Sequence, residues 1–512
     1  MKKYSLYDAD MYNDFKTFID RKFEKYKNKP AITTYNEAGE ISTKTYKEMM
    51  CDIYALAEEF ANKGLANKHT AIISQNSYMY VVSFFAILYI GGTVIPVDTE
   101  QSTSTIKFMI SFADTDFILV SESMLEDIQS EGILEKTPFV ILSENKNIKG
   151  GFYETLENGN KLIAERGRMC KDVVISPDEK AVIIYTSGTT NVSKPVVLSQ
   201  KAILVNAIEA TKLVKLPEKF FSSLPLYHAY GLTCAFISSM ANGSELCLNG
   251  DLRYMLRDFM VYKPEGIMAV PLIVETLYKY IMNGYSFPEL KMIICGGAHL
   301  SVKIAKSLNK CGIRVQEGYG ITECAPLITV NRNEHYKIGM VGLALPGYEI
   351  KIQDGEIYVK GTSLMSGYYK NEELTKEAIE NGWFKTGDLG HIDDDGFLAI
   401  TGRKKNVIVL KNGKKVSPEE LELILSGIPI IKEALVYGSS VGNAADDVVP
   451  AVTIYPDPEL SKGKQSYEIL SEIQAEVDLI NEKLPTFKQI RLINLRENEF
   501  EKTSSKKIKR KI

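Results

Sequence analysis

The residues best suited to binding phosphate lie in the segment YTSGTTNVSKPVVLS, residues 185–199 of this 512-residue chain. Hydroxyl groups, closely spaced backbone N–H groups and a mobile cation can together wrap a polyphosphate. Here they are supplied by Ser187, Gly188, Thr189, Thr190 and Lys194. The segment follows an apolar run at residues 181–185, which we expect to be a buried strand. A strand that leads into such a loop predicts a site for nucleotide phosphates.

This loop does not fit the Walker A pattern G-x-x-x-x-G-K-[ST]. Gly188 matches the first glycine, but Ser193 replaces the second glycine and Pro195 replaces the hydroxyl residue that binds the metal. Losing that hydroxyl removes a Mg²⁺ ligand. The sequence therefore argues against a P-loop kinase or motor.

The composition of the loop resembles the phosphate loop of the adenylate-forming (AMP-binding) superfamily, which includes acyl-CoA synthetases, luciferases and nonribosomal-peptide adenylation domains. Further motifs follow in the family's order across nearly the whole chain. They are LPLYHAYGLT (224–233), ICGGA (294–298), EGYGITECAP (317–326), WFKTGDLG (383–390), GRKKN (402–406) and KTSSKKIKR (502–510). By this ordered set the chain is identified as a member of the superfamily, most similar to bacterial acyl-CoA synthetases and fatty-acid–CoA ligases.

The resemblance implies a nucleotide site. Tyr319 would stack on the adenine, a contact worth roughly 1–3 kcal/mol. Asp388 would accept both ribose hydroxyls, and Arg403 would lie near ribose and phosphate. Glu323 would hold Mg²⁺, which prefers carboxylate and phosphate oxygens. The nucleotide-binding residues implied are Thr186, Ser187, Gly188, Thr189, Thr190, Gly297, Ala298, Glu317, Gly318, Tyr319, Gly320, Thr322, Asp388 and Arg403.

The resemblance also implies catalytic and moving parts. The catalytic residues would be Lys194, His228, Thr322 and Lys507. Thr322 would bond the α-phosphate, His228 would gate the acyl pocket, and Lys507 would bridge the carboxylate and the α-phosphate. A cation is needed there because an anionic carboxylate must attack an anionic phosphate. Lys405 would be the hinge about which a small domain turns, and Gly413 would line the tunnel for the incoming thiol.

The implied activity is that of an ATP-dependent acid–thiol ligase with ATP, Mg²⁺ and coenzyme A as cofactors. A carboxylic acid would become an acyl-adenylate with release of pyrophosphate, and a thiol would then take the acyl group. No acidic residue lies between Pro225 and Ser244, so an α-ammonium group would lack a partner. We therefore expect an aliphatic acid first and an aryl acid second.

Two alternatives remain open. The thiol could belong to the phosphopantetheine of an acyl carrier protein. Alternatively, the chain could be a nucleotide-binding homologue with weakened catalysis, because it departs from the family's pattern at Asn191, Pro195 and Lys506. Asparagine tolerates left-handed backbone, but proline removes an N–H donor.

The secondary structure expected around these residues is that of an α/β chain. Apolar residues recur at helical spacing from Tyr46 to Phe60, before Gly64, and short apolar runs such as 292–295 fit buried parallel strands. Alternating residues around Asp354-Gly355 predict a β-hairpin. Ser417, Pro418 and Glu420 predict an N-cap, a first helical residue and a capping-box glutamate.

The order of these patterns suggests two domains. We expect a large N-terminal domain over residues 1–401, with parallel-sheet subdomains and a small, β-rich, barrel-like element at about 340–401. A small, mobile α+β domain would follow over residues 402–512, with its hinge at 403–405.

Composition fits this reading. Apolar residues make up 45% and charged residues 25%, which excludes disordered and fibrous classes, and the net charge of −4 does not favour nucleic acid as a partner. Seven cysteines without a C-x-x-C pair argue against a disulfide scaffold and a zinc ribbon.

The N-terminus lacks the apolar stretch of a secretory signal. Residues 79–96 carry no charge, but Gly91-Gly92 divides them, so we expect a buried helix, a turn and a strand with no membrane span, and a cytoplasmic protein.

Overall fold

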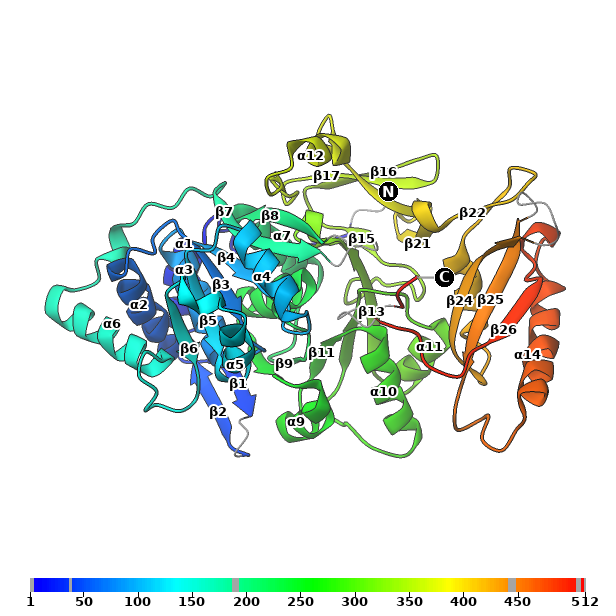
Figure 1. The fold of residues 1–512 in the computed structure, drawn as a ribbon, viewed down its shortest axis with the longest axis horizontal. Helices are drawn as coiled ribbons and strands as arrows, with labels where there is room; N and C mark the ends of the chain where they lie inside the picture. The colour runs from blue at the N-terminus through cyan, green and yellow to red at the C-terminus, as the bar shows by residue number, and fades with distance from the viewer. Residues whose placement is uncertain (1–3, 36–38, 187–192, 441–447, 503–507, 511–512) are drawn as a thin grey trace.

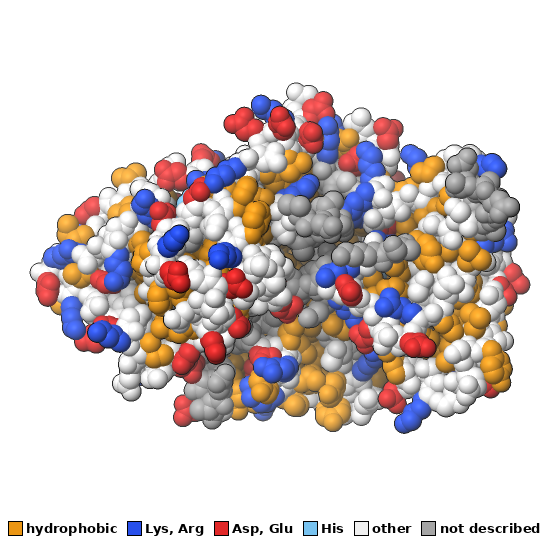
Figure 2. Space-filling view, in the orientation of Figure 1, with side chains coloured by type: hydrophobic (Ala, Val, Ile, Leu, Met, Phe, Trp, Pro, Cys, Tyr) orange, Lys and Arg blue, Asp and Glu red, His pale blue; other side chains and the backbone are white. Residues whose placement is uncertain are grey.

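The computed structural model describes residues 4–35, 39–186, 193–440, 448–502 and 508–510. Figure 1 shows two sheets flanked by helices, with a small β layer at the top of the view and a separate C-terminal unit at the right. The expected α/β class is confirmed. Acidic and basic side chains are interspersed over the face seen in Figure 2, without a continuous basic stripe on that face.

The first sheet carries the phosphate-loop segment near one edge. Its strands lie in the order β18-β8-β7-β4-β3-β5-β6. Their bounds are β18 (Gly367–Tyr368), β8 (Lys194–Ser199), β7 (Lys180–Thr186), β4 (Thr93–Pro96), β3 (His69–Ile73), β5 (Phe117–Ser121) and β6 (Phe139–Leu142). From β7 to β6 the neighbours are parallel, whereas β8 is antiparallel to both β7 and β18.

The second sheet carries most of the other motifs. Its order is β15-β14-β13-β12-β11-β9-β10-β1-β2. The bounds are β15 (Leu343–Ala344), β14 (Leu327–Val330), β13 (Arg314–Gly320), β12 (Met292–Cys295), β11 (Gly266–Ala269), β9 (Lys219–Ser222), β10 (Glu245–Leu248), β1 (Pro30–Tyr35) and β2 (Ile41–Thr45). The central run from β13 to β1 is parallel, so several strands end at the same edge.

Helices flank these sheets. They are α1 (Phe15–Phe18), α2 (Tyr46–Asn62), α3 (Tyr78–Tyr89), α4 (Thr103–Phe112), α5 (Glu122–Ser130), α6 (Phe152–Arg166), α7 (Gln200–Leu213), α8 (Ser238–Asn242), α9 (Met255–Tyr262), α10 (Pro271–Met282) and α11 (Val302–Lys310). The predicted helix from Tyr46 is α2, which begins with a capping box of Thr45 and Glu48. The chain leaves α2 through Gly64, whose φ of +77° favours glycine.

The uncharged stretch at residues 79–96 is a buried helix, a turn and a strand, as expected. Every residue of α3 from Met79 to Tyr89 is buried, and β4 lies inside the first sheet between β7 and β3. The turn between them uses Gly91 at φ +77°. In the part of the chain that the structure describes, no helix has both the length and the apolar character needed to cross a membrane.

The small β layer is an antiparallel sheet with strands in the order β16-β17-β20-β19 and β21 paired to β20. The bounds are β16 (Tyr348–Gln353), β17 (Glu356–Gly361), β19 (Ile379–Glu380), β20 (Trp383–Ile392) and β21 (Leu398–Arg403), with helix α12 (Glu372–Ala378) beside it. The predicted hairpin is confirmed, because Asp354 and Gly355 turn at φ +52° and +80° between β16 and β17.

The C-terminal unit has its own apolar core, formed by residues from Ile408 onward. Its elements are β22 (Ile408–Val409), β23 (Lys415–Val416), α13 (Pro418–Leu425), β24 (Ile431–Ser440), β25 (Val448–Pro456), α14 (Ser466–Asn481) and β26 (Leu492–Leu495). Helix α13 begins at Pro418, as predicted, but the predicted capping box is wrong. The Ser417 hydroxyl is directed to the Thr401 carbonyl (2.6 Å) and to Glu419 Oε2 (3.0 Å), and its oxygen accepts no N–H of the helix.

Candidate active site

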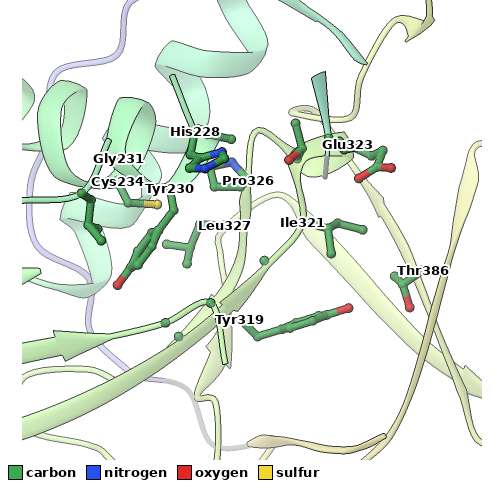
Figure 3. A pocket seen from close by; sticks show the side chains of 18 of the residues that line it. His228, Tyr230, Gly231, Cys234, Tyr319, Ile321, Glu323, Pro326, Leu327 and Thr386 are labelled. Carbon is green, nitrogen blue, oxygen red and sulfur yellow. The ribbon is translucent and has the colours of Figure 1, made fainter. Parts of the chain in front are cut away.

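A cavity of about 750 Å³ lies where four parallel strands of the second sheet end. Pro225 follows β9, Val270 follows β11, Gly297 follows β12, and Gly320 closes β13; all four residues line the cavity. The carboxyl edge of such a sheet is where α/β proteins bind ligands. In Figure 3 His228, Tyr230 and Cys234 lie on one side, and Tyr319 extends toward the side of Thr386 and Glu323.

One end of the cavity is lined by Tyr319 and Arg403, which both contact the buried carboxylate of Asp388. Asp388 itself does not line the cavity. Asp388 is only 2% exposed; Tyr319 donates its hydroxyl to Asp388 Oδ2 (2.6 Å), and Arg403 Nε forms an ion pair with Oδ1 (2.8 Å). Burial, and then the nearby Asp388 charge, raises the pKa of Tyr319 well above its usual value, so the phenol stays a donor. A carboxylate accepts about four hydrogen bonds. Tyr319 uses part of this capacity, so the Asp388 carboxylate can still accept further hydrogen bonds.

A second cluster joins the implied metal carboxylate to the phosphate-loop lysine. Glu323 lies in a short 3₁₀ turn, and Tyr368 of β18 donates its hydroxyl to Glu323 Oε1 (2.9 Å). Lys194 Nζ lies 5.3 Å from the centre of the Tyr368 ring. Strand β18 pairs with β8, and the Tyr369 N–H donates to the Pro195 carbonyl (2.8 Å), so Pro195 fits within this strand arrangement. Tyr368 was missed by the sequence analysis.

Magnesium fits this cluster by the chemistry of its donors. Among the described residues, no group of three or more His, Cys, Asp or Glu side chains is placed to hold a metal. Mg²⁺ is commonly bound by one or two carboxylates together with substrate phosphates. Glu323, with Oε2 not used by Tyr368, offers that single carboxylate beside Thr322 in the cavity wall.

The opposite end of the cavity is mostly apolar. From Ala210 to Gly297, none of the described residues that line it is an aspartate, glutamate, lysine or arginine. A π-helical segment, Tyr230–Ile237, contributes to this wall, and the Tyr230 hydroxyl donates to the carbonyls of Ala269 (3.3 Å) and Ile294 (3.2 Å). These bonds fix the Tyr230 ring in the cavity wall.

The structure brings many of the implied residues to this cavity. The residues at its lining are Thr186, Lys194, His228, Gly297, Gly318, Tyr319, Gly320, Thr322, Glu323, Arg403 and Lys405. Partial desolvation, followed by the charges of Arg403 and Lys194, lowers the pKa of Lys405. Those three cations therefore lie close enough to one another to interact.

Other implied residues lie elsewhere. Ala298 is exposed and is not part of the lining, and Gly413 is an exposed turn residue at φ +76° between β22 and β23. Ser187, Gly188, Thr189, Thr190 and Lys507 lie outside the described residues, as do the departures Asn191 and Lys506.

Glu317 belongs to β13, is buried and does not line the cavity; its carboxylate accepts the backbone N–H of Gly339 (3.1 Å). Burial raises the pKa of Glu317 to about 7, so the folded protein holds this proton more tightly than the unfolded chain. The stability due to this group therefore falls as pH rises from about 4.5 to about 7.

We expect Glu317→Gln, which cannot ionise, to remove that pH dependence. Relative to wild type, its free energy of unfolding should rise by about 2–3 kcal/mol between about pH 4.5 and pH 8. Urea unfolding at the two pH values measures the change. Parallel pH profiles for the two proteins would contradict this role of Glu317.

The comparisons with known proteins identify the family. Residues 19–369 match the family described as AMP-binding enzyme, and residues 405–512 match the AMP-binding enzyme C-terminal domain. The chain belongs to the AMP-binding enzyme family, and its similarity to the relatives below makes it an enzyme of the acid–thiol ligase type.

One relative and two solved structures align with nearly the whole chain. A long-chain-fatty-acid–CoA ligase of Mycobacterium bovis, FadD15, is 27% identical over 96% of this chain and 94% of its own length. The anthranilate CoA ligase AuaEII, solved with anthranoyl-AMP, superposes with a TM-score of 0.84 at 19% identity, covering 98% of this chain and 97% of its own. The o-succinylbenzoate coenzyme A synthetase of Bacillus subtilis, solved with ATP and magnesium, has a TM-score of 0.78 at 22% identity, covering 96% and 98%.

Proposed function

We propose that this enzyme joins an aliphatic carboxylic acid to coenzyme A in two steps. In the first, a carboxylate oxygen attacks the α-phosphorus of ATP, giving an acyl-adenylate and pyrophosphate. In the second, the thiol sulfur attacks the acyl carbonyl, giving a thioester and AMP. The observation that supports the proposal is one cavity with Tyr319 and Arg403, the partners of the buried Asp388, at one end and an uncharged, mostly apolar wall at the other.

The nucleotide would occupy the Asp388 end. Asp388 would accept the ribose hydroxyls on its free lone pairs, and Tyr319 would present its ring to the adenine. Glu323 and Thr322 would hold magnesium and the α-phosphate, and the metal ion would supply positive charge to the phosphate oxygens. The relative from B. subtilis, solved with ATP and magnesium, supports both ligands.

The acyl chain would lie along the wall between Ala210 and Gly297. A charged substrate group there would lack a counter-ion among the described residues, and burying such a charge is costly. Coenzyme A is our choice of thiol because the M. bovis relative, named as a CoA ligase, aligns over 96% of this chain. We also propose that the chain divides into two domains near residue 402. The hinge would be Lys405, and the thiol would enter near Gly413.

A panel of acids tests the proposed substrate. We expect pyrophosphate release to rise with straight-chain length until the cavity is filled, by about 0.8 kcal/mol, or roughly fourfold, for each buried methylene. Benzoate should be slower, and α-amino acids should be inactive. A panel in which only α-amino acids release pyrophosphate would rule out this substrate class, and thioester formation with a holo-carrier protein but not with coenzyme A would rule out the proposed thiol.

Two variants test whether the acyl chain binds along this apolar wall. Ala210→Phe adds a ring to the apolar wall, so it should reduce turnover of the longest acid more than that of the shortest. Ala475→Phe places the same ring on an exposed position of α14 and should leave the chain-length ranking unchanged. If the chain-length ranking is also unchanged in Ala210→Phe, the apolar wall does not bind the acyl chain.

A further inference from the structure

Glu356 is a buried carboxylate that contacts two functionally different parts of the chain. It opens β17, directly after the Asp354-Gly355 turn, and is 5% exposed. Its Oε1 accepts the N–H of Gly387 (3.2 Å), and its Oε2 accepts from Lys404 Nζ (2.6 Å). A charge in so dry a position must be compensated by partners, so both contacts are needed to hold it.

The Gly387 contact reaches the nucleotide end of the cavity. Gly387 precedes Asp388 and adopts φ +69°, which favours glycine. Thr386, on its other side, donates its hydroxyl to the Ile357 carbonyl (2.7 Å) and accepts the Asp388 N–H (3.0 Å). Glu356 and these bonds fix the backbone that carries Asp388.

The Lys404 contact reaches the connector between β21 and the C-terminal unit. Strand β21 ends at Arg403, and Lys404 begins the short 3₁₀ turn Lys404–Asn406. The Lys404 side chain is 65% exposed, whereas that of Glu356 is 6% exposed, so the ammonium reaches inward to a buried partner. The bond to Glu356 raises the pKa of Lys404 and keeps it charged.

We propose that Glu356 is a positioning residue that clamps the stationary end of the connector while it holds the Asp388 loop. This inference rests on the proposed function, in which Lys405 is the hinge. With Lys404 fixed by Glu356 and Arg403 by Asp388, backbone rotation begins at Lys405. One carboxylate thereby keeps the nucleotide loop still while the C-terminal unit turns.

Three substitutions separate the two contacts. Lys404→Met removes only the ammonium. Glu356→Gln keeps a carbonyl oxygen for the Gly387 N–H but loses the charge that holds Lys404. Glu356→Ala removes both contacts. Hydrogen exchange on the full-length protein should therefore be about tenfold faster over residues 402–408 in all three variants, and faster over residues 384–390 in Glu356→Ala alone.

Nucleotide affinity provides the second measurement. By calorimetry, ATP should bind about fivefold or more weakly to Glu356→Ala and within about twofold of wild type to Lys404→Met and Glu356→Gln. Lys404→Arg restores a cation and should restore slow exchange over residues 402–408. Lys464→Met is the matched control, because Lys464 forms an ion pair of the same length (2.6 Å) with Glu472 on the exposed surface. Lys464→Met should leave the hydrogen-exchange rates of both segments and the affinity for ATP unchanged.

Three results would contradict either the role of Glu356 or the proposed function. If Lys404→Met accelerates exchange in both segments equally, or in neither, Glu356 is not a clamp with two separable contacts. Equal ATP affinities for Glu356→Ala and Glu356→Gln would overturn its role in the Asp388 loop. If the wild-type protein binds no ATP, the proposed function fails, while the exchange pattern still decides whether the clamp exists.

Discussion

Replacing Asp388 with alanine should weaken ATP binding by about tenfold to a hundredfold. Hydrogen bonds to charged groups contribute about 1.5–3 kcal/mol. The ribose would lose its charged acceptor, and the donors of Tyr319 and Arg403 would lose the carboxylate that now orients them. Isothermal calorimetry with ATP measures the effect directly.

Two variants control this experiment. Asp388→Asn keeps one acceptor oxygen and should give an intermediate affinity. Glu380→Ala removes an exposed carboxylate from β19, beside the same strand β20, and should bind ATP like wild type. Thermal unfolding of all three checks that the fold persists. Wild-type affinity in a folded Asp388→Ala protein would refute the assignment of the ribose site.

Replacing Lys507 with alanine should slow acyl-adenylate formation by about 10²–10³-fold, the typical cost of losing one preorganised donor that stabilises developing charge. This expectation comes from the position of Lys507 in the terminal motif KTSSKKIKR. The variant should still convert supplied acyl-adenylate to thioester, because the second step involves no attack on phosphate. Pyrophosphate release and thioester formation, assayed separately, distinguish the two steps.

Lys506→Ala is the matched control, since it removes a neighbouring positive charge from the same tail and should change little. Lys405→Pro should have the converse effect and slow thioester formation, because proline restricts backbone rotation at a hinge. If Lys506→Ala abolishes adenylation and Lys507→Ala does not, the tail is misaligned by one residue. Equal slowing of the same step by the Lys405 and Lys507 variants would exclude domain alternation.

Much of the fold could be predicted because its signals are local. Helical spacing from Tyr46 indicated α2, and Asp354-Gly355 indicated the β16–β17 hairpin, since each pattern depends on neighbours within one element. The capping box at Ser417 failed for the opposite reason. The Thr401 carbonyl, sixteen residues earlier, takes the serine hydroxyl, and no local pattern contains that competitor.

The sequence alone was enough to indicate the chemistry. The motifs around residues 185–199, 317–326 and 383–390 indicated an ATP-dependent, adenylate-forming enzyme, since residue types and short spacings set which ligands a segment can bind. It could not determine which side chains meet. Asp388 and Tyr319 are 69 residues apart, Glu323 and Tyr368 are 45 apart, and Glu356 and Lys404 are 48 apart.

These pairings become visible only in the folded chain, because each depends on how separate sheets and strands pack against one another. The same packing buried the side chain of Glu317, a residue of β13, although its motif pointed to the nucleotide. Tyr368 and Glu356 were not predicted, because neither residue belongs to a motif of its own. Tyr368 contacts Glu323, and Glu356 contacts Gly387, only because the packing of distant strands brings each pair within hydrogen-bond distance.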